Sequence, residues 1–137
     1  MNVLLFGATG TLGSRIVPAL LSHSHHVVAL VRSRPKLLDL MPQEVHDQVQ
    51  IIEGDATDVS LIKTTLREHR ISYIINAAGS AKIFAKGPNP FVDIVNASVQ
   101  AADAIIEETH QPIGVWFVGG LLLMDVPERP DGQTLED

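Results

Sequence analysis

The stretch MNVLLFGATGTLGSR, residues 1–15, decides the fold of this chain. Residues 3–6 form a short apolar run that leads directly into glycines, a pattern that predicts a buried parallel strand. Apolar residues then recur within residues 11–21 at the spacing of a helix that faces a sheet: Leu12, Ile16, Ala19 and Leu20. The glycines therefore lie at a strand-to-helix turn, where free backbone N–H groups and the helix dipole can bind the pyrophosphate of a nucleotide.

Each position of this turn has a predicted role. Gly7 allows a tight turn out of the strand, Gly10 lets the backbone approach a phosphate, and Gly13 lets the helix pack closely on the sheet. The hydroxyl groups of Thr9 and Thr11 can donate hydrogen bonds to the same phosphates. The spacing is G-x-x-G-x-x-G and not the commoner G-x-G-x-x-G, so a glycine-rich turn without a ligand is the alternative.

The composition excludes several classes of function. The chain has 137 residues, 45% hydrophobic and 19% charged, as expected for one soluble α/β domain. A net charge of -6 without a Lys/Arg cluster argues against a nucleic-acid surface. The lack of cysteine excludes disulfides, thiolate metal sites and cysteine nucleophiles. No apolar run is long enough to span a membrane and the first strand starts almost at once, so we expect a cytoplasmic protein.

The segment SHSHH, residues 22–26, lies where the first helix is expected to end. Three histidines so close together raise the question of a metal site, but no neighbouring residue supplies a carboxylate ligand. Imidazole groups near a helix C-terminus are favoured by the negative end of the helix dipole. We therefore predict a polar turn here and no metal.

The end of the second predicted strand, residues 27–31, distinguishes between two cofactors. An Asp or Glu at this point binds the ribose 2′-hydroxyl of NAD, whereas an arginine suits the 2′-phosphate of NADP. This chain has Arg32, Ser33 and Arg34 here and no acidic residue, although Arg34 can equally be a solvated loop charge. Arg32 follows the glycine turn by about twenty residues, as the dinucleotide fingerprint requires. The sequence therefore predicts NADP in preference to NAD.

The ends of the third and fourth predicted strands, residues 50–53 and 71–76, complete the candidate site. Asp55 follows the third strand, where a carboxylate could accept a hydrogen bond from the adenine amino group. The alternative is a helix N-cap, a role that Thr57 or Asp58 fills equally well. Small residues that leave space for a ribose and a nicotinamide follow the fourth strand: Ala77, Ala78 and Gly79.

The rest of the chain continues the alternation of strands and helices. Residues 36–41, 59–69 and 91–108 have helical patterns, and residues 115–118 form a fifth apolar run. The longest helical pattern has apolar residues along one face: Val92, Val95, Val99, Ala102 and Ile106. This alternation predicts an α/β fold with a doubly wound parallel sheet of five strands in the order 3-2-1-4-5.

Four motifs together resemble the short-chain dehydrogenase/reductase superfamily: GATGTLG, VALVRS, GDATD and NAAG, at the ends of the first four strands. The atypical branch of NmrA-like and flavin-reductase-like proteins is the most similar, and VGG followed by LMDVP also resembles it. The resemblance implies a Rossmann-type NAD(P)-binding domain over residues 1–126. It further implies that the pyrophosphate contacts Gly7, Thr9, Gly10, Thr11 and Leu12, the 2′-phosphate Arg32, the adenine Asp55 and Ala56, and the nicotinamide ribose Ala77, Ala78 and Gly79.

The chain departs from this superfamily where catalytic residues are expected. Many members use a Tyr-x-x-x-Lys pair, in which the tyrosine donates a proton to a carbonyl. The only tyrosine here is Tyr73, on a predicted strand, and the residue four positions later is Ala77. Relatives also continue past the fifth strand into a substrate-binding portion, whereas residues 127–137 are a polar, acidic tail.

Two functions therefore stay open. The first is the cofactor domain of an atypical NADP-dependent oxidoreductase that acts on an unknown small molecule. The second is a non-catalytic module that senses NADP(H), as NmrA-like proteins can, and the missing proton donor favours it. Flavin-reductase-like relatives tend to have a small residue or serine after VGG, whereas residues 121–123 are bulky, which argues against their chemistry.

The fifth strand is expected to form an edge of the sheet. It leads from Trp116 and Phe117 toward the apolar segment 121–124. Unpaired hydrogen-bonding groups and exposed apolar area at such an edge recruit another chain. We therefore expect self-association, with residues 116–124 at or near the contact.

Overall fold

The computed structural model describes residues 1–78 and 90–118. Its elements follow one another as β1 (Asn2–Phe6), α1 (Gly13–Ser22), β2 (His26–Val31), α2 (Arg34–Leu40), the 3-10 helix η1 (Gln43–Gln48), β3 (Val49–Glu53), α3 (Val59–Glu68), β4 (Tyr73–Asn76), α4 (Pro90–Thr109) and β5 (Gly114–Phe117). No helix within these two ranges is long and apolar enough to cross a membrane. Three features named from the sequence lie outside the described residues: Gly79, the apolar segment 121–124 and the tail 127–137.

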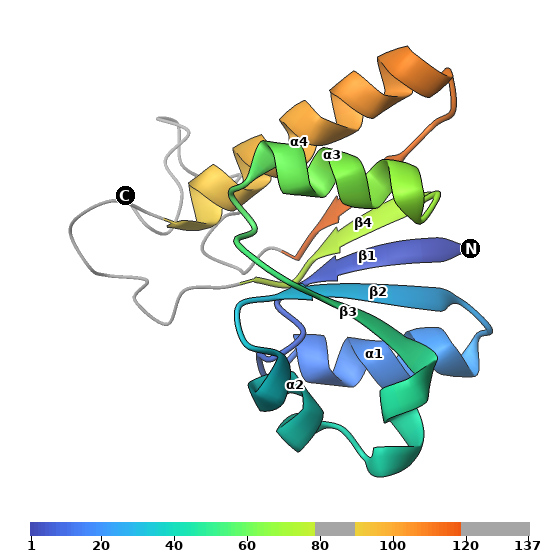
Figure 1. Cartoon of the computed structure of the whole chain (residues 1–137), viewed down its shortest axis with the longest axis vertical. Helices are drawn as coiled ribbons and strands as arrows, with labels where there is room; N and C mark the ends of the chain where they lie inside the picture. The colour runs from blue at the N-terminus through green and yellow to red at the C-terminus, as the bar shows by residue number, and fades with distance from the viewer. Residues whose placement is uncertain (79–89, 119–137) are drawn as a thin grey trace, which may run out of the picture.

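The five strands form one parallel sheet in the order β3-β2-β1-β4-β5, which confirms the predicted Rossmann-type α/β fold. β1 lies at the centre, with Leu5 opposite Ala29 of β2 on one side and Ile75 of β4 on the other. Helices α1 and α2 cover one face of the sheet, and α3 and α4 cover the other (Figure 1). Because successive side chains of a strand point to opposite faces, Leu5 enters the core under α1 and α2, whereas Leu4 and Phe6 enter the core under α3 and α4.

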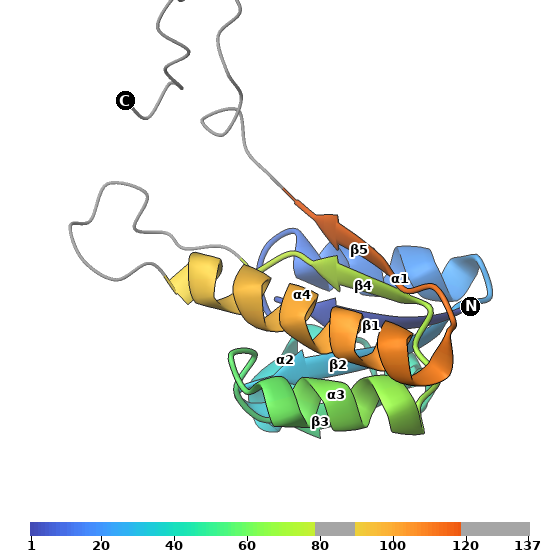
Figure 2. The same ribbon diagram turned by 90° about the horizontal axis from the view of Figure 1, so that it is seen from above.

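The longest helix, α4, packs through a different stripe from the one that its valines suggested. Figure 2 shows α4 beside α3 on the same face of the sheet. Val92 and Val99 are 49% and 40% exposed, and of the predicted face Ala102 is the buried member. Small side chains let two helices and a sheet approach closely, which β-branched valines at the same positions would prevent. The buried stripe is accordingly rich in small residues: Ile94, Ala97, Ser98, Ala101, Ala102 and Ile105.

Hydrogen bonds at the helix starts settle which residues act as caps. The Asp58 carboxylate accepts the Leu61 N–H at 3.1 Å, so Asp58 caps α3 and leaves Asp55 for another role. Ser33 caps α2 in the same way, because its hydroxyl oxygen accepts the Lys36 N–H at 3.4 Å. Helix α1 begins at Gly13, two residues later than its apolar pattern suggested, and no side chain caps it.

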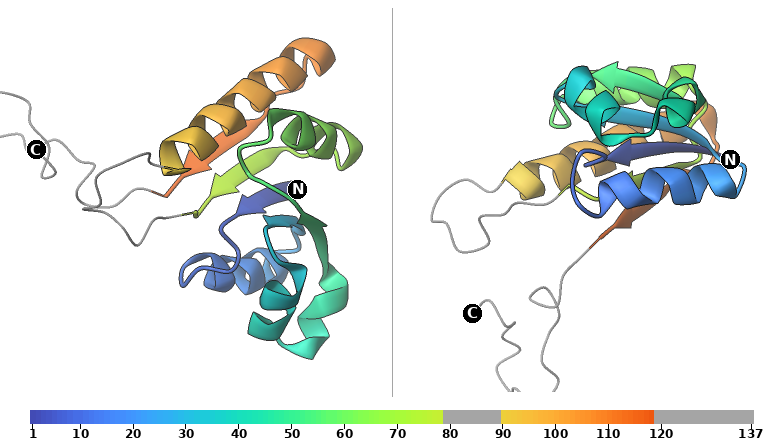
Figure 3. Two further views of the ribbon diagram at one scale, coloured as in Figure 1. Left: turned by 60° about the vertical axis from the view of Figure 1, so that its left-hand side comes forward. Right: turned by 90° about the horizontal axis from the view of Figure 1, so that it is seen from below.

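β5 forms one edge of the sheet and pairs with β4. Helix α4 packs against it from one side, and in the right-hand view of Figure 3 the strand projects beyond α1 on the other. Trp116, Phe117 and Val118 are 64%, 40% and 40% exposed. Within residues 1–78 and 90–118, Trp116, Phe117 and Val118 therefore give this edge the exposed apolar side chains that the sequence predicted.

We expect Gly7→Ala to lower the free energy of unfolding by at least roughly 1–3 kcal/mol, because a strained conformation alone costs that much and the backbone of Ala77 and Ala78 must also shift. Gly7 has a φ of 79°, and a Cβ there would meet the backbone of Ala77 and Ala78. Gly10→Ala is the control, because Gly10 lies outside the left-handed region and its added methyl would meet the Gly7 carbonyl oxygen at 3.3 Å. We expect that variant to change stability by less than about 1 kcal/mol in urea unfolding. Equal losses in both variants would contradict the assignment.

Candidate functional site

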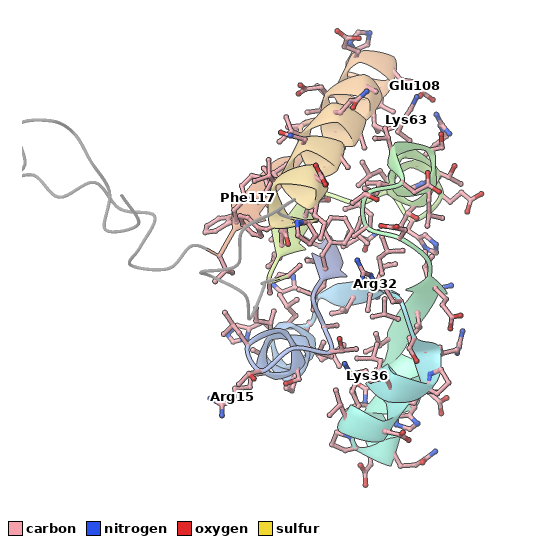
Figure 4. The ribbon with its side chains drawn as sticks, turned by 90° about the vertical axis from the view of Figure 1, so that its left-hand side faces the viewer. Arg15, Arg32, Lys36, Lys63, Glu108 and Phe117 are labelled. Atoms are coloured by element: carbon pink, nitrogen blue, oxygen red, sulfur yellow. The ribbon has the colours of Figure 1, made fainter. Side chains whose placement is uncertain are left out.

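A cavity of about 570 Å³ opens at the carboxyl ends of the strands, the edge at which ligands bind in parallel α/β sheets. Five segments of the chain form its walls: the β1–α1 turn, the end of β2 with the start of α2, the end of β3, the end of β4 and the first turn of α4. Figure 4 looks onto this edge of the sheet. The residues that were named from the sequence and line the cavity are Gly7, Thr9, Gly10, Arg32, Ala56, Ala77 and Ala78.

The β1–α1 turn carries free hydrogen-bond donors. The Gly10 N–H bonds the Gly7 carbonyl at 3.0 Å and closes the turn. The N–H groups of Thr11, Leu12 and Gly13 have no acceptor in the described part of the chain, as is normal for a helix start without a cap. These three residues lie beside the cavity wall and not in its lining. Free donors at the positive end of α1 suit an anionic ligand.

Close packing holds this turn against the rest of the sheet. A Cβ on Gly13 would collide with the Gly7 carbonyl oxygen, so the first turn of α1 rests directly on the end of β1. At Gly10 the one neighbour within 4 Å of such an atom is that same oxygen, at 3.3 Å, so an added methyl group would make a single tight contact there. The turn therefore presents bare backbone to the cavity.

Two cations stand at the β2 side of the cavity. Arg32 follows the end of β2, and Lys36 lies in the first turn of α2, where Figure 4 shows both side chains. Neither side chain has a hydrogen-bond or ion-pair partner among the described residues. Lys36 was not among the site residues predicted from the sequence, although Ser33 and Pro35 together are a recognisable helix start. That start places Lys36 one helical turn from Arg32.

The backbone N–H groups of Arg34 and Lys36, at the start of α2, already have acceptors within the protein. The Arg34 N–H donates to the Glu53 carboxylate at 3.0 Å, and the Lys36 N–H donates to the Ser33 hydroxyl. Arg34 itself is exposed and does not line the cavity. An anion at this side of the cavity would therefore meet the side chains of Arg32 and Lys36 and not the end of the helix.

Asp55 does not line the cavity, although Gly54 and Ala56 on either side of it do. Its carboxylate accepts the backbone N–H of Thr57 at 2.8 Å and the Thr57 hydroxyl at 2.7 Å. These bonds, with a smaller contribution from the nearby charge of Arg32, lower the pKa of Asp55 below its ordinary value. Asp55 is thus engaged within its own turn, and Ala56 supplies the cavity wall.

The far wall combines the end of β4 with the start of α4. Ala77 and Ala78 line it, together with Pro90, Phe91 and Ile94, which were not among the site residues predicted from the sequence. The topology could have predicted that the start of α4 lies at the site, because every crossover helix of a parallel sheet starts at its carboxyl edge. The wall is apolar, which suits a flat ring more than a charged group.

Tyr73 lies at the amino end of β4, whereas the cavity opens beyond the carboxyl end. The amino and carboxyl ends of β4, a strand of four residues, are roughly 10 Å apart, so the single tyrosine of the chain does not reach the cavity. Within residues 1–78 and 90–118, no group of three or more His, Asp or Glu side chains is arranged to hold a metal ion. Near the end of α1, His23 instead bonds the Ala19 carbonyl oxygen at 2.9 Å.

Comparison with known proteins gives three kinds of similarity. The profile of a family described as NAD(P)H-binding matches residues 7–111. Oxidoreductase nsrR of Aspergillus novofumigatus (strain IBT 16806) is 34% identical over 73 residues, which cover 52% of this chain and 28% of the relative. UDP-glucose 4-epimerase of Neisseria meningitidis (strain Z2491) is 30% identical over 81 residues, which cover 57% of this chain and 24% of the relative.

Among solved structures, the UDP-glucose 4-epimerase of Thermus thermophilus in complex with NAD is similar in fold, with a TM-score of 0.67 and 21% identity. The similarity covers 98% of this chain and 44% of that one. The chain therefore spans about a quarter of each of the two relatives and less than half of this structure.

We expect Thr57→Val to raise the pKa of Asp55 toward its ordinary value, because it removes the hydroxyl donor and keeps the backbone donor. A lowered pKa stabilises the folded protein above the unfolded pKa of Asp, and this contribution is lost as the pH falls through the folded pKa. Carboxyl ¹³C NMR titration of the wild type and the variant measures the change. Thr57→Ser keeps the hydroxyl and is the control; an identical Asp55 pKa in Thr57→Val and Thr57→Ser would contradict the assignment.

Proposed function

Since this chain belongs to the NAD(P)H-binding family, whose profile matches residues 7–111, we propose that its cavity holds NADP(H) in preference to NAD(H). The coarser conclusion is established: the chain is an NAD(P)-binding domain with a Rossmann-type fold. The choice between the two cofactors and the NmrA-like branch are the proposal.

The shape of the cavity supports one arrangement of the dinucleotide. The pyrophosphate would lie at the β1–α1 turn, against Gly10 and the free N–H groups at the start of α1. The adenosine half would lie toward Arg32 and Ala56, and the nicotinamide half toward the apolar wall at Ala78. In such an arrangement the chain supplies binding and orientation, and the bound nicotinamide supplies hydride chemistry.

One observation carries the preference for NADP. Two cations that have no hydrogen-bond or ion-pair partner among the described residues, Arg32 and Lys36, line the cavity at the end of β2, where NAD-binding folds place an acidic residue. The Thermus epimerase was solved with NAD, so the preference does not come from that structure. The preference rests instead on the positive charges of Arg32 and Lys36. Because Glu53 and Ser33 occupy backbone donors at the start of α2, the 2′-phosphate would be bound by these two side chains.

For the reaction, we propose the cofactor domain of an atypical oxidoreductase of the short-chain dehydrogenase/reductase superfamily. The similarity to oxidoreductase nsrR supports a redox role. Tyr73 lies at the amino end of β4 and does not reach the cavity to donate a proton, so a carbonyl, a quinone and a flavin all stay open as the hydride acceptor. The alternative is a non-catalytic module that senses NADP(H), and the same missing donor favours it. Turnover of NADPH with carbonyl, flavin or quinone acceptors would separate the two.

We expect Arg32→Ala to weaken NADPH binding about tenfold or more, because a charge-assisted contact to phosphate is worth roughly 1.5–3 kcal/mol. NADH affinity should change little, since NADH has no 2′-phosphate. Arg34→Ala is a matched control, because Arg34 is exposed nearby and lies outside the cavity. Calorimetric titration of both cofactors measures the effect. Equal wild-type affinities for NADPH and NADH, or unchanged NADPH binding in Arg32→Ala, would refute the preference.

We further propose that the β5 edge pairs with a second copy of the chain, since within the described residues no further strand pairs with its outer side and Trp116 and Phe117 are exposed. Sedimentation velocity at micromolar concentration should show self-association that Trp116→Lys weakens. Leu40→Lys is the control, because Leu40 is 49% exposed on α2, away from this edge. A wild-type chain that stays monomeric across the concentration range would rule this contact out.

A further inference from the structure

Asn76 is fully buried at the end of β4, and its side chain forms one hydrogen bond with the described residues. Its Oδ1 accepts the Ala78 N–H at 3.0 Å, two residues later, which fixes the path of the chain as it leaves the strand. The Nδ2 group has no hydrogen-bond partner in the described part of the chain. The side chain therefore accepts a hydrogen bond through Oδ1, whereas its Nδ2 donor has no partner among the described residues.

The position of this unpaired donor argues against a role in stability. Alternation along β4 places Asn76 on the same face as Ile74, within the apolar core under α3 and α4. A buried NH₂ group without a partner destabilises the folded state, and an apolar side chain of similar size would avoid that cost. Because the buried NH₂ group of Asn76 is unfavourable for stability while its Oδ1 fixes a cavity wall, the residue is better explained by a role in the site than by a role in folding.

The segment that Asn76 holds lies directly against the glycine turn. The Ala77 N–H bonds the Phe6 carbonyl at 3.0 Å, and the backbone of Ala77 and Ala78 fills the space where a Gly7 side chain would be. Both Gly7 and Ala78 line the cavity. A rotation of the Ala77–Ala78 peptide would therefore change the wall opposite Arg32 and press on the glycine turn.

We infer that Asn76 is a positioning residue for the nicotinamide half of the site: it acts through Ala78 and does not contact the cofactor. This inference rests on the proposed function, because it assumes that the cavity holds a dinucleotide with its nicotinamide half near Ala78. The adenosine half would then lie at the other end of the cavity, beside Arg32 and Lys36. Loss of the Oδ1 acceptor should therefore affect the two halves unequally.

The test compares Asn76→Ser with Asn76→Ala, which differ by a single hydroxyl group. Both variants remove the same bulk and the unpaired NH₂, whereas a serine hydroxyl can still accept the N–H two residues later. The probes are NADPH and adenosine 2′,5′-bisphosphate, which carries the adenosine end alone. We expect NADPH to bind Asn76→Ala roughly two- to tenfold more weakly than Asn76→Ser, the effect of one hydrogen bond. Both variants should bind adenosine 2′,5′-bisphosphate equally.

Amide hydrogen exchange at Ala78 gives a second readout that does not depend on the cofactor. The Ala78 amide should exchange slowly in the wild type and in Asn76→Ser, and faster in Asn76→Ala. Equal NADPH affinities in the two variants, equal Ala78 exchange, or a parallel loss of both ligands in Asn76→Ala would overturn the positioning role alone. A folded wild-type protein that binds neither probe would instead overturn the proposed function, and this inference with it.

Discussion

The structure depends on the close approach of two strand ends, where the backbone of Ala77 and Ala78 occupies the place of a side chain on Gly7. This approach requires glycine, because the chain turns there with a φ of 79° and no Cβ would fit. It brings the β1–α1 turn and the end of β4 together as two sides of one cavity. Gly13 must be a glycine for a similar reason, because a Cβ there would collide with the Gly7 carbonyl oxygen where α1 packs on this turn.

The electrostatics of the cavity differ from those of the chain as a whole. The net charge is -6, yet the described side chains that line the cavity include Arg32 and Lys36 and no acidic residue. The nearby acids are engaged elsewhere: Glu53 accepts a backbone N–H at the start of α2, and Asp55 is held by Thr57. With the free N–H groups of α1, this arrangement attracts an anion locally although the protein is acidic.

The two ends of the sheet have different roles. The carboxyl end gathers the glycine turn, the cations and the start of α4, whereas Tyr73 lies at the amino end of β4. The described residues thus provide for binding and orientation of a dinucleotide more clearly than for proton transfer. This division fits a domain whose chemistry belongs to its cofactor. The acceptor of any hydride would have to be positioned by groups other than the tyrosine.

The sequence by itself determined the strand order and the edge that carries the site, because apolar runs, turn glycines and crossover handedness are local or topological constraints. Gly7 and Arg32 could be placed at the cavity for that reason, since each directly follows a strand. Only the tertiary structure decided that α4 packs through Ala97 and Ala101, that Lys36 and Phe91 reach the cavity, and that Asp55 turns toward Thr57. Those outcomes depend on close packing and on competition for hydrogen bonds, which no local pattern of residues encodes.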